Sequence, residues 1–246
     1  LADLEFMNLV QYDAMTFGNH EFDKGSEVLN DFIEHAEFPF VSSNVNFSAD
    51  ALLTQKFKNE ATRDAKDATI YPAIIMEVDG EQVGLIGLTT EDTANIASPG
   101  DVTFENAVQK AKDTVAMLQK EGINKIVVLS HLGYDVDVNL AKEVEGIDII
   151  VGGHSHTKLD EAVVDRSDSE PKLIVQTGEK GQFLGQLEVV FDEEGVLQEW
   201  NSSLISVDEK DSAGQYVIQP DQEALQILNT KYKPGVEQLK QTEVGT

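Results

Sequence analysis

Gly18-Asn19-His20-Glu21-Phe22-Asp23 is the stretch of sequence that decides how this chain is organised. It follows the short apolar run 14–17 and precedes a segment of helical periodicity that begins near Ser26. A carboxamide, an imidazole and a carboxylate therefore lie close together, directly behind a predicted strand. Alone, this turn is weak evidence for chemistry, because a histidine beside an aspartate is often a simple helix-cap contact.

Two more histidine-bearing turns follow predicted strands of the same kind. Ser130-His131-Leu132-Gly133 closes the buried run 125–130, and Gly152-Gly153-His154-Ser155-His156 closes the apolar run 147–151. Ligands gather at the carboxyl ends of parallel strands. Three turns that each deliver imidazole or amide groups therefore predict a metal site. The alternatives are exposed turn histidines beside permissive glycines and an asparagine that only forms a turn.

The composition is that of a globular protein with a strongly acidic balance. Acidic residues number 45 and basic residues 18, so the formal net charge of the 246 residues is -27. Such a surface repels nucleic-acid polymers, whose binding depends on Lys and Arg. A small phosphate ester can still bind where divalent cations reverse the local potential. Cysteine is absent, so any metal must be held by oxygen and imidazole nitrogen.

The hydrophobic periodicity predicts alternating strands and helices as far as residue 156. An Asp79-Gly80 turn between the apolar runs 71–78 and 82–88 predicts a β-hairpin. Strand-helix-strand order in this part predicts right-handed parallel crossovers. The other expected features are the end of a helix in 1–10, a strand entering the first turn at 14–17, a helix over 26–36 that buries Val28, Leu29, Phe32 and Ile33, a strand in 38–41, a surface insertion over 47–69, a helix from Phe104 to Leu118 closed by Gly122, and a helix over 136–144.

After His156 the pattern changes to one typical of antiparallel strands. Residues 173–177, 183–191 and 196–206 alternate between apolar and polar and are separated by glycines and acidic turns. We therefore expect two facing sheets with helices outside them. Residues 220–232 and 234–241 are expected to form two helices, the first begun by a proline and an acidic first turn.

The histidine turns resemble those of the calcineurin-like metallophosphoesterases, and specifically of the secreted 5'-nucleotidase family. The resemblance extends from about Leu4 to the end of the chain, with Tyr12-Asp13-Ala14, Ser42-Ser43-Asn44-Val45 and Gly84-Leu85-Ile86-Gly87-Leu88 as supporting blocks. It implies the α/β class, as a four-layer α/β-β-α sandwich of two mixed sheets flanked by helices. It also implies a catalytic domain over 1–218 and a helical linker over 219–246 that leads toward a C-terminal substrate-binding domain.

By this resemblance the protein uses two divalent metal ions, Zn, Mn or similar, to activate a water molecule. Asn19, His131 and His154 would serve one ion, and His156 would serve the other.

His20 is adjacent to Asn19, and because neighbouring side chains diverge we expect it to face the phosphate and not the metal. There it would stabilise developing charge and protonate the leaving oxygen. Asp23 would hold and charge the ring of His20, and its competing role is a helix N-cap. Asn44 either touches the substrate or a metal shell, or is a buried turn residue. His35 is expected at the surface, and Asp135 and Asp137 at the start of a helix.

The chain departs from the family pattern in one respect. The family has an Asp-x-His and a Gly-Asp motif upstream of the Gly-Asn-His turn, and these supply two ligands to one ion and the carboxylate that bridges both. Asp3 and Asp13 match neither motif. We therefore expect a fragment that lacks its first strand and its C-terminal domain, and that is inactive as given.

The function expected from the resemblance is hydrolysis of nucleotide phosphate esters by a 5'-nucleotidase mechanism, outside the cytoplasm: extracellular, periplasmic or at the cell surface. Alternatives are a 2',3'-cyclic-nucleotide 2'-phosphodiesterase with 3'-nucleotidase activity or a UDP-sugar hydrolase. An alternative of another class is a non-catalytic surface-binding module with a degenerate metal site. The expected partner is a small nucleotide or nucleotide-sugar substrate and no nucleic-acid polymer, and no run has the length of a membrane span.

Overall fold

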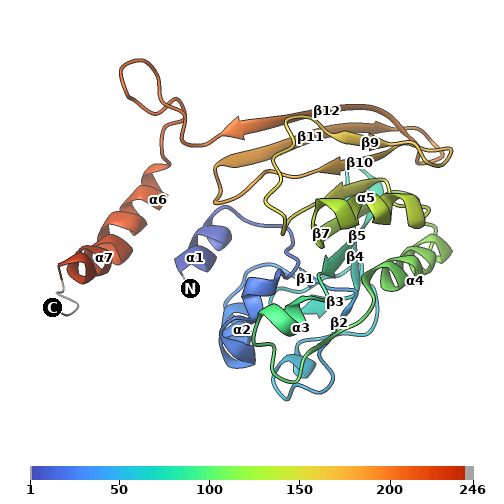
Figure 1. Ribbon diagram of the computed structural model, residues 1–246, viewed down its shortest axis with the longest axis horizontal. Coiled ribbons are helices and arrows are strands. Elements are labelled where there is room, and N and C mark those ends of the chain that lie inside the picture. The colour runs from blue at the N-terminus through green and yellow to red at the C-terminus, as the bar shows by residue number, and fades with distance from the viewer. Residues whose placement is uncertain (1, 242–246) are drawn as a thin grey trace.

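The structure is a computed structural model that describes residues 2–241 (Figure 1). Its centre is a six-stranded sheet in the order β4-β5-β7-β8-β10-β9. Strands β5, β7, β8 and β10 run parallel, and β4 and β9 are antiparallel to their neighbours at the two edges. The bounds are β4 Ala73–Val78, β5 Glu81–Thr89, β7 Ile126–His131, β8 Ile149–Val151, β9 Val163–Asp165 and β10 Lys172–Val175.

The β4–β5 hairpin has the predicted turn. Asp79 and Gly80 both have positive φ angles, 52° and 85°, which is the conformation that a tight primed turn requires. Register pairs Val78 with Glu81 across this turn. The hairpin prediction is confirmed.

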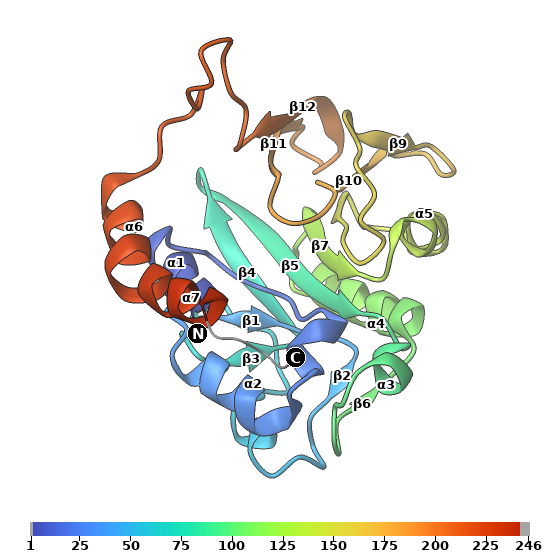
Figure 2. The same cartoon turned by 60° about the vertical axis from the view of Figure 1, so that its left-hand side comes forward.

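Two helices cover one face of the central sheet. These are α4 (Ala107–Lys120) and α5 (Tyr134–Glu143), and their apolar sides pack on Ile126, Val128 and other inward residues of the strands. Side chains alternate across a strand, so Val127 and Leu129 face the opposite way. Figure 2 shows α4 and α5 beside β7 and β5, with α3 (Thr93–Ile96) beyond the end of α4.

A long antiparallel hairpin lies over part of the opposite face. It consists of β11 (Phe183–Phe191) and β12 (Leu197–Ser206). Leu197 is buried with Ile149 and Leu173 of the central sheet, and Val127 packs against the same cluster. The antiparallel prediction holds for this pair. For 173–177 it holds on one side only, because β10 pairs antiparallel with β9 and parallel with β8.

A separate cluster of aromatic residues forms the core of the N-terminal part of the chain. Phe17 stacks on Phe40 with ring centroids 5.1 Å apart, and Leu29 and Ile33 of α2 (Gly25–Glu34) cover them. The short elements here are α1 (Ala2–Leu9), the 3₁₀ helices η1 (Asn19–Phe22) and η2 (Leu53–Gln55), and the paired strands β1 (Phe40–Val41) with β3 (Ile70–Tyr71) and β2 (Val45–Asn46) with β6 (Thr103–Phe104). The result is an α/β sandwich of several sheets flanked by helices.

Some expectations for this region are corrected by the structure. The segment 47–69 is no mere surface insertion, since Phe47 and Leu53 are fully buried. Val28 is 53% exposed, because only Leu29 and Ile33 of its helix point fully inward. Residues 14–17 form only an isolated bridge from Met15 to Phe40, which leaves the expected strand unformed.

The last part of the described chain is a helical arm. Helix α6 (Gln222–Ile227), the π-helical segment η3 (Leu228–Tyr232) and α7 (Lys233–Lys240) follow one another. Figure 1 shows this arm standing beside α1, away from the sheets. The helical prediction for 220–232 and 234–241 is confirmed in type, but the first helix begins at Gln222, after Asp221 as N-cap, and not at the proline. Leu1 and residues 242–246, which belong to the predicted 1–218 and 219–246 division, lie outside the described residues.

Candidate metal centre

Asn19 joins the three histidine-bearing turns at a single atom. Its Oδ1 lies 2.9 Å from Nε2 of His131 and 3.1 Å from Nδ1 of His154. The centroids of the two rings are 5.1 Å apart, and the ring planes are tilted by 60°. Asn19 begins η1, His131 ends β7, and His154 follows β8. The structure thus brings together three residues that the sequence predicted as ligands of one metal ion.

Two glycines make room for the ring of His131. A Cβ added to Gly18 would lie 2.7 Å from Cε1 of His131, and one added to Gly153 would lie 3.1 Å from its Nδ1. Neither distance leaves space for a side chain without movement of the ring. The backbone N–H of Gly18 also donates to Glu21 Oε2 at 2.6 Å, which ties the start of η1 to its own third residue.

Electrostatics favour the neutral form of His131. Burial lowers the pKa of His131 to about 4, and the nearby imidazoles of His154, His20 and His156 act in the same direction. A neutral imidazole offers a nitrogen lone pair to a cation. The ring is therefore in its ligand form at neutral pH.

The donor set fits one divalent ion such as Zn or Mn. Two imidazole nitrogens and one amide oxygen converge, which is a mixture that these ions accept. Because Gly18 and Gly153 have no side chains, the His131 ring has room to lie beside Asn19 and His154. Among residues 2–241, no cluster of three or more His, Cys, Asp or Glu side chains is placed to bind a metal. The convergent set instead consists of two histidines and an asparagine.

His20 lies on the same turn but makes a different contact. Its Nδ1 is 2.7 Å from Asp23 Oδ2, and its side chain is 75% exposed. The hydrogen bond and the charge of Asp23 raise the pKa of His20. Asp23 makes no side-chain cap to α2, whose N-cap is Lys24. The contact with His20 is the one that the sequence analysis preferred for Asp23.

His156 has a partner outside the Asn19 cluster. Its Nδ1 lies 3.1 Å from Glu179 Oε2, and its side chain is 61% exposed. Its place as ligand to a second metal ion stays a prediction.

Asn44 is fully buried and occupied by the backbone. Its Nδ2 donates to the carbonyls of Thr89 and Glu105, and its Oδ1 accepts from Thr89 N. Such a residue fastens the end of β5 to the loop before α4. The contacts favour the buried-turn alternative over the expected contact with substrate or metal shell.

Asp137 was assigned only to a helix start, and the structure gives it a further place. It is fully buried, and Ser130 Oγ donates to its Oδ1 at 2.5 Å. Ser130 Oγ in turn accepts from Leu132 N, so the pair supports the turn that carries His131. Burial raises the pKa of Asp137 to about 7. The sequence signal for this residue is weak, because an acidic first turn is common in helices.

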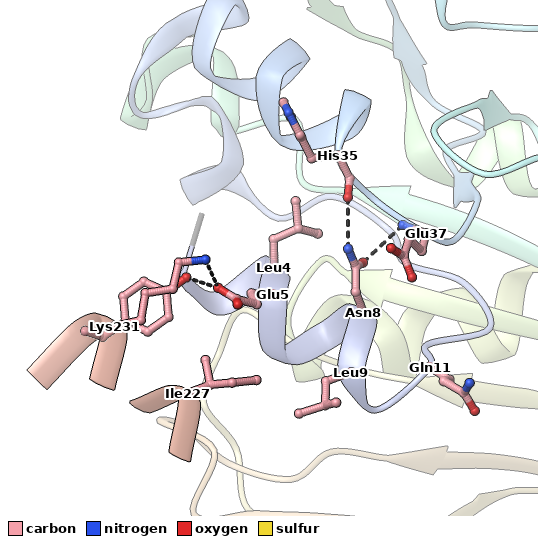
Figure 3. A pocket seen from close by; sticks show the side chains of 10 residues that line it. Leu4, Glu5, Asn8, Leu9, Gln11, His35, Glu37, Ile227 and Lys231 are labelled. Atoms are coloured by element: carbon pink, nitrogen blue, oxygen red, sulfur yellow. Dashed lines mark hydrogen bonds and ion pairs between the residues drawn. The ribbon is translucent and has the colours of Figure 1, made fainter. Parts of the chain in front are cut away.

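A cavity of about 650 Å³ lies away from this centre, between α1 and the helical arm (Figure 3). Glu5 is paired there with Lys231 and Tyr232. Asn8 donates to the carbonyl of His35 and accepts from Glu37 N. The contacts of Glu5 attach the arm to α1, and those of Asn8 attach α1 to the backbone after α2. His35 itself is exposed, as predicted.

The chain is similar to several known proteins. The model of the calcineurin-like phosphoesterase family matches residues 1–158. Among curated proteins, the trifunctional nucleotide phosphoesterase protein YfkN of Bacillus subtilis is 43% identical over all of this chain and 18% of its own length. A protein of Treponema pallidum named "Probable 5'-nucleotidase" is 34% identical over 80% of this chain and 34% of its own length.

A solved structure gives the same result for the fold. The 5'-nucleotidase precursor from Thermus thermophilus superposes with a TM-score of 0.84 and 36% identity, over 98% of this chain and 46% of that one. The chain thus spans between about a fifth and a third of the length of the curated relatives named here.

Proposed function

Because the chain belongs to the calcineurin-like phosphoesterase family, we propose that it serves the hydrolysis of nucleotide phosphate esters in the manner of a 5'-nucleotidase. The observation that carries this proposal is the convergence of Asn19, His131 and His154 beside the pair His20 and Asp23. The names of the relatives support the substrate class, since they include nucleotidases and a nucleotide phosphoesterase.

Asn19, His131 and His154 would hold one divalent ion, and His156 is proposed for a second. Members of the family use divalent metals. When bound, such ions neutralise phosphoryl oxygens and lower the pKa of a coordinated water. Bound cations would also offset the negative potential at the site, since a protein with a net charge of -27 would otherwise repel a phosphate dianion.

His20 is proposed to act on the phosphate itself. Its ring is exposed and is turned toward Asp23 rather than into the Asn19 cluster. The carboxylate of Asp23 raises the pKa of His20, so a larger share of the ring carries a proton near neutral pH. A protonated imidazole can stabilise charge on the phosphoryl group and give its proton to the leaving oxygen.

A broader phosphoesterase activity is the second candidate. It is favoured by the 43% identity to a protein named as trifunctional. Cyclic nucleotides, 3'-nucleotides and UDP-sugars are therefore included as candidate substrates. A non-catalytic binding module is the alternative of another class.

Location outside the cytoplasm is proposed from the likeness to other proteins. One relative, from Crotalus adamanteus, is named a snake venom 5'-nucleotidase and is 33% identical over 78% of this chain. No helix among the described residues is long and apolar enough to cross a membrane.

The experiment is a substrate panel with the longest available form of the protein in Mn²⁺ or Zn²⁺. AMP, 3'-AMP, 2',3'-cyclic AMP and UDP-glucose are tested in parallel, with His154→Ala as the metal-site control. We expect metal-dependent release of phosphate from AMP that His154→Ala abolishes. Metal binding without hydrolysis of any member of the panel would favour the binding module, and hydrolysis that survives His154→Ala would overturn the site assignment.

A further inference from the structure

The turn that carries His154 and His156 has an unusual backbone. Both histidines have positive φ angles, 69° and 56°. A non-glycine residue in this left-handed region is disfavoured by roughly 1–2 kcal/mol, and such conformations persist only where surrounding contacts impose them. Something outside the turn must therefore hold these two residues.

Gln176 supplies the contacts from outside. It follows β10, the strand next to β8, and its Oε1 accepts from the backbone N of Thr157 at 2.6 Å and from Ser155 Oγ at 3.1 Å. Ser155 Oγ also accepts from Tyr134 N at 3.0 Å, at the start of α5. One amide oxygen thus accepts hydrogen bonds from Ser155 and Thr157, the two residues that directly flank His156.

The orientation of the Gln176 amide is set by its partners. Thr157 N can only donate, so the atom that faces it must be the oxygen. The side chain is 2% exposed, and buried polar groups bind more strongly than exposed ones where the local dielectric is low. The main chain of Gln176 also binds the segment after the turn, because its carbonyl accepts a hydrogen bond from Leu159 N at 3.0 Å.

The other end of the amide approaches a second support. A Cβ placed on Gly152 would lie 3.0 Å from Gln176 Nε2 and 2.5 Å from Asp137 Oδ2. Asp137 holds the turn of His131 through Ser130. The side chains that hold the two histidine turns therefore both lie close to Gly152 and leave no room for a side chain there.

From this geometry we propose that Gln176 is a positioning residue for the proposed metal centre. It imposes the left-handed conformation on the turn and so presents His154 to Asn19. The inference rests on the proposed function only for the identity of the ligand, since the hold on the turn is present without a metal. Partners that orient metal ligands typically change metal affinity by about 10- to 100-fold when lost.

The test compares Gln176→Met with the wild-type chain of 246 residues. Methionine keeps the length and removes the acceptor. In the metal-free protein, histidine ring signals are followed by NMR, and in a second measurement the Zn²⁺ dissociation constant is obtained by competition with a chelating dye. We expect the ring signals of His154 and His156 to shift or broaden while those of His20 and His35 stay, and Zn²⁺ binding to weaken by about 10- to 100-fold.

Two further variants separate positioning from general stability. Gln176→Glu, compared with wild type at a pH where the buried carboxyl is protonated, keeps the acceptor oxygen and is expected to bind Zn²⁺ within about threefold of wild type, well inside the loss expected when the partner is removed. Gln186→Met makes the same substitution at an exposed site on β11 and is expected to change neither measurement. Unchanged His154 and His156 signals in Gln176→Met, or equal loss in the glutamate variant, would overturn the proposal.

Two other outcomes also test the role of Gln176: a Gln176→Met variant that does not fold and a wild-type protein that binds no Zn²⁺. If Gln176→Met does not fold, Ser155→Ala removes the exposed hydroxyl partner, and perturbed His154 and His156 signals support the proposal whereas unchanged signals contradict it. If wild-type protein binds no Zn²⁺, the proposed metal centre fails, while the metal-free NMR comparison still decides the role of Gln176.

Discussion

Nδ1 of His20 lies 2.7 Å from Oδ2 of Asp23, three residues further along the chain. The pair is exposed and stands beside the Asn19 cluster without entering it. An imidazole placed in this way can meet a substrate without serving as a metal ligand. This separation of roles leads to the first prediction.

Substitution of His20 by alanine should reduce turnover by about a hundredfold or more, the usual contribution of a general acid. Bound metal should remain nearly unchanged, because the ring contacts Asp23 and not Asn19. Turnover and metal content are measured on the same sample of a form that hydrolyses nucleotides. His35→Ala is the matched control, since His35 is also exposed and bound to an aspartate, Asp31, on α2. Loss of metal together with activity would move His20 into the metal shell.

The described chain should bind close to one Zn²⁺ or Mn²⁺ ion. Asn19, His131 and His154 converge, whereas His156 is engaged by Glu179. A single imidazole competes poorly with water for a divalent cation. Metal analysis after dialysis should give about one ion per chain, and Asn19→Ala should lower it strongly. Two tightly held ions in the 246-residue chain would require ligands among carboxylates that this structure places elsewhere.

Stability should depend on pH through Asp148. Burial raises its pKa to about 7 even though Ile126 N donates to it at 2.7 Å. Between about pH 4 and pH 7 the folded protein therefore holds a proton that the unfolded chain releases, so this residue lowers stability as the pH rises.

Asp148→Asn removes that dependence and keeps an acceptor oxygen. The free energy of unfolding of the variant, relative to wild type, should increase by at least about 1 kcal/mol from pH 4 to pH 7 and then level off. Urea unfolding at several pH values measures it, with the exposed Asp67→Asn as control. A difference that stays flat across this range would show that the buried carboxyl titrates normally.

Moderate salt should raise the melting temperature. The net charge of -27 produces self-repulsion, which mobile ions screen over about 10 Å at 0.1 M. Thermal melts at low and moderate NaCl test this. A melting temperature that is constant or falls would mean that local ion pairs, such as Arg63 with Glu121, offset the repulsion.

Much of the fold and of the candidate site could be predicted from strand ends. His131 at the end of β7 and His154 shortly after β8 were expected from the ends of parallel strands, whereas Asn19 begins η1 after a segment that forms no strand, and the structure brings the three together. The same rule could have found Gln176, which directly follows β10. The antiparallel pattern expected over 173–177 does not point to that strand end, because only parallel strands gather ligands at one edge of a sheet.

Other features depended on packing that periodicity does not record. Phe47 and Leu53 lie in a segment without helical or strand spacing, and only the surrounding aromatic cluster explains their burial. Asn44 is a residue type that is common in turns, and its side chain makes three hydrogen bonds to the backbone of Thr89 and Glu105, which are far from it in sequence. In the sequence Asp137 is an acidic residue in the first turn of a helix, and only the fold shows that Ser130 donates a hydrogen bond to it.

The Asn19 cluster joins residues that are 112 and 135 positions apart in the chain. Contacts of such long sequence separation form late, because the entropy of closing long loops must be overcome first. During synthesis, the contact between Asn19 and His154 cannot form before residue 154 has emerged. A cation that binds this cluster therefore stabilises only the completed fold, so mass action by the ion would disfavour partly folded chains.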